Sequence, residues 1–202
     1  MALPRPARQD ADMKTFTRSL LALCCLAVAA AAPAQETAQD HRQQALRLLE
    51  PLPLSNPTPV TVSAAEAQTR ARPRDPDAWN QLGQSLDVAG RYPEAVAAFE
   101  RATRLPPRIL GRAYLYRDLA EAREKVGDLA GALAAARVSL RSWPLSRDGL
   151  HCLGSEVKTM ARLLVKSGDV AGAAAFYRPL FARDRGNEDC ARIDAALGGA
   201  AG

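Results

Sequence analysis

Apolar residues recur every three to four positions along most of this chain, and this is the spacing of a buried helix face. One such stripe consists of Trp79, Leu82, Leu86 and Ala89, and the next consists of Ala95, Ala98, Phe99 and Ala102. Strict alternation of apolar and polar residues, which is typical of a half-buried strand, is almost absent. The pattern therefore predicts an all-α protein.

Glycine interrupts the helical pattern at regular places. The segment GDLAGALAAA begins at Gly127, and the similar GDVAGAAAFY begins at Gly168, 41 residues later. A looser copy, GRYPEAVAAF, begins at Gly90, 37 residues before Gly127. Glycine readily takes the left-handed conformation that ends a helix, and the carboxylates of Asp128 and Asp169 can cap the helix that follows. We therefore expect three helical hairpins, each turning at one of these glycines.

The first hairpin resembles the tetratricopeptide repeat (TPR) family, whose unit is a helix–turn–helix of about 34 residues. The residues that carry the resemblance are Trp79, Leu82, Gly83, Ala95, Phe99, Ala102 and Pro107. The second copy supplies Gly127 and Ala132, and the third supplies Gly168 and Ala173 but lacks the closing proline. The resemblance covers about residues 76–184. It implies an all-α solenoid of about three TPR-like helical hairpins plus a C-terminal capping helix.

The third copy departs from the usual length. The glycine of the third hairpin follows that of the second by seven residues more than the usual repeat length of ~34. Seven residues correspond to about two turns of an α-helix. We interpret residues 148–167 as a lengthened first helix of the third hairpin. Pro179 predicts a kink near Tyr177–Pro179 in the second helix. Residues 187–197 then predict a terminal helix that covers the open end of the stack.

The N-terminal residues have the organisation of a secretory signal peptide. Lys14 and Arg18 precede an uncharged stretch from Ser19 to Ala32, and small residues occupy the positions that signal peptidase inspects, ending at Ala34. The uncharged stretch is too short and too rich in alanine to predict a permanent membrane span. We therefore expect cleavage after Ala34 and a periplasmic mature protein.

Translation is expected to begin at Met13, because residues 1–12 sit in front of the signal pattern. Lipidation of Cys24 or Cys25 is a less favoured alternative, because neither follows a small residue. Ser63 and Glu66 fit a capping box that begins a short helix. The expected organisation is residues 1–34 as N-terminal extension and signal peptide, 35–62 as short helix and proline-rich linker, 63–198 as TPR-like domain, and 199–202 as flexible tail.

Charge narrows the classes of partner. The full chain has 27 basic and 22 acidic residues, but 23 basic and 20 acidic residues remain after position 34. This small excess does not predict nucleic-acid binding. The run RARPR at Arg70–Arg74 is more simply interpreted as a solvated helix end.

The sequence offers little for catalysis or metal binding. His151 and Cys152 would point about 100° apart on a helix, so they would not converge as a catalytic pair. In the expected mature chain, two histidines and two cysteines are scattered without the spacing of metal ligands. We therefore expect no enzyme activity, cofactor or metal. Cys152 and Cys190 are the mature cysteines, and an oxidising compartment favours a disulfide between them. Two unpaired thiols are the alternative.

The TPR resemblance implies a concave groove lined by the first helix of each hairpin. The positions that would face it are Asn80, Gln84, Tyr114, Arg117, Glu121, Lys158 and Arg162, flanked by Asp77, Asp87, Glu124, Ser155 and Lys166. The charges run from acidic and amide to basic along the groove. We expect the basic residues to be exposed, to contribute little to stability, and to receive an acidic segment of a partner.

The predicted function is that of a periplasmic adaptor or assembly factor that binds a protein or peptide in this groove. Alternatives are a homodimer formed through the terminal repeats, an accessory subunit of a periplasmic enzyme complex, and binding of an envelope polymer. Polymer binding should need exposed aromatic side chains in the groove, and Tyr114 is the one candidate there.

Overall fold

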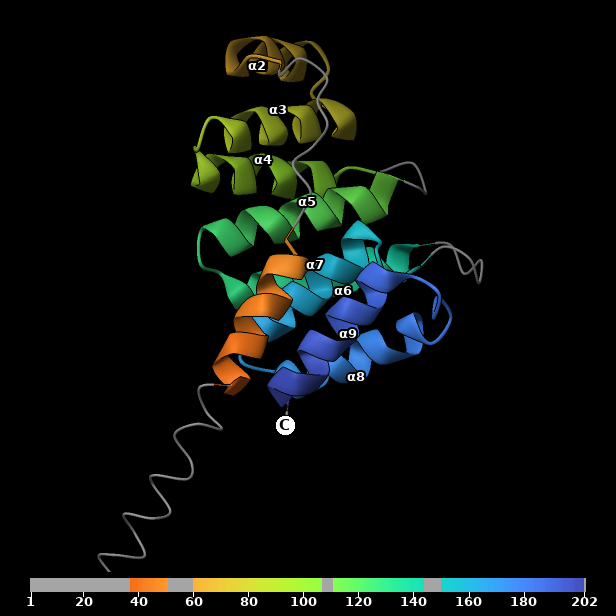
Figure 1. The fold of residues 1–202 in the computed structure, drawn as a ribbon. Coiled ribbons are helices and arrows are strands. Elements are labelled where there is room, and N and C mark those ends of the chain that lie inside the picture. The colour runs from red at the N-terminus through yellow and green to blue at the C-terminus, as the bar shows by residue number, and fades with distance from the viewer. Residues whose placement is uncertain (1–36, 51–59, 107–110, 144–149, 202) are drawn as a thin grey trace, which may run out of the picture.

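The computed structural model describes residues 37–50, 60–106, 111–143 and 150–201, without the side chain of Ala201. All regular secondary structure in these ranges is α-helical, which confirms the predicted fold class (Figure 1). The signal peptide, the proline-rich linker and Pro107 lie outside the described residues. Within those residues, no helix is both long and apolar enough to cross a membrane.

Nine helical segments follow one another in the described ranges. The first covers residues 37–48 and is called the N-terminal helix below. The others are α2 (Val62–Ala71), α3 (Pro76–Val88), α4 (Tyr92–Arg104), α5 (Gly111–Lys125), α6 (Leu129–Ser142), α7 (Ser155–Lys166), α8 (Val170–Phe181) and α9 (Glu188–Ala201). The three predicted hairpins are α3–α4, α5–α6 and α7–α8. They stack in chain order, with α2 packed before the first hairpin and α9 packed on α8 (Figure 1).

The repeated sequence forms the hairpin turns. The turn glycines have positive φ angles of 74°, 82° and 92° at Gly90, Gly127 and Gly168, as predicted. Asp128 caps α6 by accepting a hydrogen bond of 2.9 Å from the backbone N–H of Gly131. A Cβ atom at Gly131 would lie 2.0 Å from this carboxylate, so the cap accounts for the glycine three residues later. The turn before α8 repeats the arrangement with Asp169 and Gly172.

Alanine lets the paired helices approach closely. Ala95, Ala132 and Ala173 hold equivalent places in the second helices of the hairpins and are fully buried. Phe99 is also buried, with 3% of its surface exposed. Trp79 is only partly buried, and its indole N–H donates to the carbonyl of Pro73 at 3.0 Å.

Two predicted helix starts are wrong. Helix α7 begins at Ser155 rather than near residue 148. Within the described part of the segment that was predicted to lengthen it, residues 151–154 form a turn instead. A 2.9 Å hydrogen bond from the Gly154 N–H to the His151 carbonyl closes this turn. Helix α2 begins at Val62, because Thr61, two residues before the predicted cap Ser63, provides its cap. Helix α8 continues through Pro179 and ends two residues later.

A disulfide joins Cys152, in the turn before α7, to Cys190 in the first turn of α9, as predicted. The two Cα atoms are 5.8 Å apart, and the bridge spans 38 positions of sequence. Helix α9 buries Ile193, Ala196 and Leu197, so it covers apolar surface at the end of the stack. The predicted capping helix is therefore present and covalently tied to the third hairpin.

The N-terminal helix lies at the opposite end of the stack from α2, although α2 follows it in sequence (Figure 1). Arg42 donates a 3.0 Å hydrogen bond to the carbonyl of Val165, near the end of α7. Ala45 and Leu49 are fully buried. A Cβ atom at Gly199 would lie 2.8 Å from the His41 ring, so the same helix also contacts α9. The sequence did not predict this placement.

Candidate functional site

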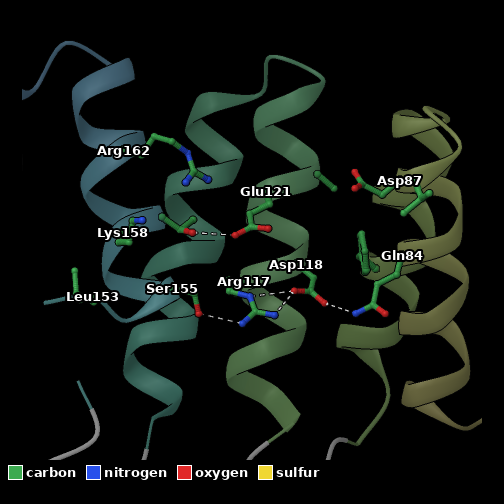
Figure 2. Close-up of a pocket in the computed structure, with 13 residues that line it drawn as sticks. Gln84, Asp87, Arg117, Asp118, Glu121, Leu153, Ser155, Lys158 and Arg162 are labelled. Carbon is green, nitrogen blue, oxygen red and sulfur yellow. Dashed lines mark hydrogen bonds and ion pairs between the residues drawn. The ribbon is translucent and has the colours of Figure 1, made fainter. Parts of the chain in front are cut away.

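The first helices of the three hairpins, α3, α5 and α7, surround a pocket of about 260 Å³ (Figure 2). Five of the predicted groove residues line it: Gln84, Arg117, Glu121, Lys158 and Arg162. The flanking positions Asp87 and Ser155 line it as well. The structure therefore brings side chains from three separated stretches of sequence to one site.

Apolar residues that were not predicted for the groove also line the pocket. Val88 lies one helical turn after Gln84 and is 69% exposed, while the Phe99 ring reaches in from α4. Ala122 and Leu153 complete the apolar part of the wall. The helical spacing could have indicated Val88. It could not have indicated Leu153, which lies in the turn before α7.

A continuous line of hydrogen bonds crosses all three helices (Figure 2). Gln84 donates to Asp118 at 3.0 Å, and Arg117 donates to the other oxygen of Asp118 at 2.8 Å. Arg117 then donates to Ser155 at 3.2 Å and to Glu156 at 3.4 Å. Burial would lower the pKa of Arg117, but the neighbouring carboxylates, Asp118 first, outweigh burial and raise it. The line therefore fixes one polar wall of the pocket.

Arg162 is buried, and the prediction that it is exposed is wrong. Only 4% of its surface is accessible, because the N-terminal helix covers it and its guanidinium donates to the carbonyl of Leu49 at 3.0 Å. It also pairs with Glu124 at 2.9 Å, and Lys166 approaches the same carboxylate at 2.6 Å. Burial tends to raise the pKa of Glu124, but Arg162 and Lys166 together lower it. This buried group supports the fold.

Lys158 is directed to the end of the N-terminal helix. Its ammonium donates to the carbonyl of Glu50 at 2.9 Å. Burial, and then the charge of Arg162, lower the pKa of Lys158. Lys158 and Arg162 thus bind the backbone carbonyls of Glu50 and Leu49, the two residues that follow the N-terminal helix. The expectation of an acidic partner depended on Lys158 and Arg162 of α7, and both are already bound to other groups of the chain.

Glu121 differs from the other carboxylates around the pocket. It accepts a 3.0 Å hydrogen bond from the hydroxyl of Thr159, but within the described chain no cation lies within 4 Å of its carboxylate. Burial, and then the charge of Asp118, raise the pKa of Glu121, while Arg117 and Arg162 lower it less strongly. Its negative charge is therefore only partly compensated.

Two predicted groove residues do not line the pocket. The Tyr114 ring packs edge to face on Trp143, with centroids 5.6 Å apart, and the Arg117 guanidinium lies 5.2 Å from its centre. The side-chain oxygen of Asn80 is buried and accepts no hydrogen bond from the described residues. Tyr114 is 43% exposed, but it lies against Trp143 and Arg117 and provides no stacking platform in the pocket.

Among the described residues, no group of three or more His, Cys, Asp or Glu side chains is arranged to hold a metal ion. Cys152 is bonded to Cys190, so it carries no free thiol beside His151. The ion pairs and hydrogen bonds around the pocket hold helices together, and the arrangement suits recognition of a partner's side chains.

Comparison with known proteins agrees with the repeat geometry. A tetratricopeptide repeat family model matches residues 62–109 and 81–147. The crystal structure of MamA is similar in fold, with a TM-score of 0.51 at 12% identity, over 67% of this chain and 84% of that one. No curated protein matches the sequence. The described part of the chain is an all-helical repeat fold, and residues 62–147 match tetratricopeptide repeats.

Proposed function

We propose that this protein is an adaptor or assembly factor that binds a segment of another protein in the groove formed by α3, α5 and α7. Tetratricopeptide repeat proteins bind protein partners. The observation that carries the proposal is the pocket itself, because it combines a fixed polar wall from successive first helices with exposed apolar surface at Val88. Such a surface suits an extended or helical protein segment.

The proposed location is the periplasm. The order of charged, apolar and small residues before Ala34 supports export. The disulfide between Cys152 and Cys190 is compatible with an oxidising compartment. Binding of an envelope polymer is less well supported, because the one aromatic candidate, Tyr114, packs on Trp143 outside the pocket.

Site-specific photo-crosslinking tests the groove. Val88 lines the pocket and is 69% exposed, whereas Val126 is 41% exposed in the turn after α5 and does not line it. Each valine is replaced in turn by p-benzoylphenylalanine, and the full chain is irradiated in a periplasmic extract of its own host. We expect one defined partner to be crosslinked from position 88 and not from position 126. Equal labelling from both positions would contradict the groove assignment.

A further inference from the structure

The carboxylates around the pocket differ in how well neighbouring cations compensate their charge. Asp87 is paired with Lys125 at 2.6 Å, and Asp118 shares Arg117 with Glu156. One guanidinium therefore serves two carboxylates on the side of the pocket formed by α5 and the start of α7. Glu121 adds a further carboxylate to this side with only a hydroxyl as hydrogen-bond donor.

The opposite side of the pocket is basic, but its donors are occupied. Arg162 is bound to Glu124 and to the Leu49 carbonyl, and Lys158 is bound to the Glu50 carbonyl. An incoming carboxylate would have to displace the end of the N-terminal helix, whose Leu49 side chain is fully buried. The side that can accept a new charged group without such displacement is the acidic one.

The surroundings of Glu121 suit a long side chain with an apolar stem. Val88 exposes apolar surface at the pocket, and Ala122 of α5 and the ring of Phe99 from α4, both almost fully buried, line the pocket beside it. Lysine and arginine bury their methylene stems on apolar surface while their charged heads reach a polar group. Burial raises the pKa of Glu121, so a bound cation would relieve an existing cost of keeping this carboxylate ionised.

From this geometry we infer that the pocket binds a lysine or arginine side chain of the partner segment, with the cationic head at the Glu121 carboxylate and the stem against Val88, Phe99 and Ala122. The inference rests on the proposed function, because it specifies which residue the groove selects. The sequence alone suggested an acidic partner segment, whereas this inference calls for a basic one.

Nuclear magnetic resonance titration of the full mature chain tests this inference. The probes are capped Ala-Ala-X-Ala-Ala peptides with Lys, Gln or Glu at X, together with propylguanidinium as an isolated side-chain analogue. We expect the Lys peptide and propylguanidinium to shift the amide signals of Glu121, Ala122 and Thr159, with at least tenfold weaker binding of the Gln and Glu peptides. Glu121→Gln should reduce binding of both cations at least tenfold.

Glu100→Gln is the matched control, because it makes the same substitution on α4 outside the pocket lining. It should leave binding of the cations unchanged. Equal binding of Lys and Gln peptides, unchanged binding by Glu121→Gln, or no shift with any probe would overturn the inference. The proposed function is tested separately by the Val88 crosslink. If a partner is crosslinked but the pocket shows no preference for cations, the proposed function stands and the cation site is overturned. If the pocket binds cations but no partner is crosslinked, the proposed function is not supported.

Discussion

The Phe99 ring occupies the space that a side chain at Gly83 would need. A Cβ atom built on Gly83 would lie 2.5 Å from Cε1 of Phe99, well inside van der Waals contact. Gly83 is on the first helix of the first hairpin and Phe99 is on the second, so this pair sets how closely α3 and α4 approach. It also gives a physical reason why a glycine and an aromatic residue occur together in this repeat.

The Gly83–Phe99 pair predicts non-additive effects on stability. Phe99→Ala should lower the free energy of unfolding by about 3–5 kcal/mol, the range for a buried phenylalanine. Gly83→Ala should cost about 1–3 kcal/mol by overpacking. In the double variant the clash is absent, so Gly83→Ala should cost little in the Phe99→Ala background. Urea denaturation followed by circular dichroism measures all four proteins, and simple additivity would show that the ring does not fill this space.

Arg162 should be far more important for stability than its neighbour Lys166, although both pair with Glu124. The Arg162 side chain is 5% exposed and that of Lys166 is 42% exposed. Arg162→Ala removes this donor from the Leu49 carbonyl and leaves Glu124 with Lys166 alone, and it should cost about 3–5 kcal/mol. Lys166→Ala should cost below about 1 kcal/mol, as exposed pairs do. Thermal and urea unfolding of the two variants compare them, and similar losses would contradict the burial of Arg162.

Glu121 and Glu124 should affect the pH dependence of stability in opposite directions. The raised pKa of Glu121 means that folding disfavours its ionised form, so its unfavourable contribution is absent below the usual carboxyl pKa and appears as pH rises through the folded value. The lowered pKa of Glu124 means that its favourable contribution is present above the usual pKa and is lost as pH falls through the folded value.

These directions predict that Glu121→Gln stabilises the protein at pH 7 and that Glu124→Gln destabilises it. Both differences from the parent protein should shrink in acid. Urea titrations at pH 7 and at several acidic values give the comparison. A destabilised Glu121→Gln at pH 7 would mean that the carboxylate already has its compensating charge within the chain, and it would also count against the cation site.

The sequence predicted the hairpins because their determinants are local. Gly127, Asp128 and the small residue Ala132 lie within six positions of one another, so turn, cap and close packing are all specified in one short segment. The position of the N-terminal helix could not be predicted in the same way. It depends on contacts such as Arg162 with Leu49, which are separated by 113 positions.

Long-range contacts also explain why the charge of the groove was predicted wrongly. Helical spacing placed Arg117, Glu121 and Lys158 on the correct faces, but it could not show which charges are already neutralised by neighbours. Arg117 binds Asp118 beside it and Glu156 from another hairpin, and Lys158 binds the backbone carbonyl of Glu50, just after the N-terminal helix. Which charges of the groove remain available to a partner depends on these long-range pairs, so it could be determined only from the folded structure.

Export should produce a mature chain that begins at Gln35. Lys14, Arg18 and the small residues ending at Ala34 motivate this expectation. Expression from Met13 in a bacterial host, followed by fractionation and N-terminal sequencing of the periplasmic form, measures it. Replacing Ala34 by an arginine is the control, because it should block cleavage there. An unprocessed protein that stays in the cytosol would contradict the proposed location.

The disulfide should stabilise the end of the stack more than the rest of it. The bond between Cys152 and Cys190 spans 38 positions, and closing a loop of this size contributes about 2–4 kcal/mol by restricting the unfolded chain. It joins the turn before α7 to the first turn of α9, so its loss should first release α9 from α8. The double variant Cys152→Ser, Cys190→Ser should therefore unfold at lower urea, with faster amide exchange at Ile193 and Leu197 than at Phe99. Uniformly faster exchange throughout the chain would show that the stack unfolds as one unit, whereas two titratable thiols in oxidised, denatured protein would show that the bond does not form.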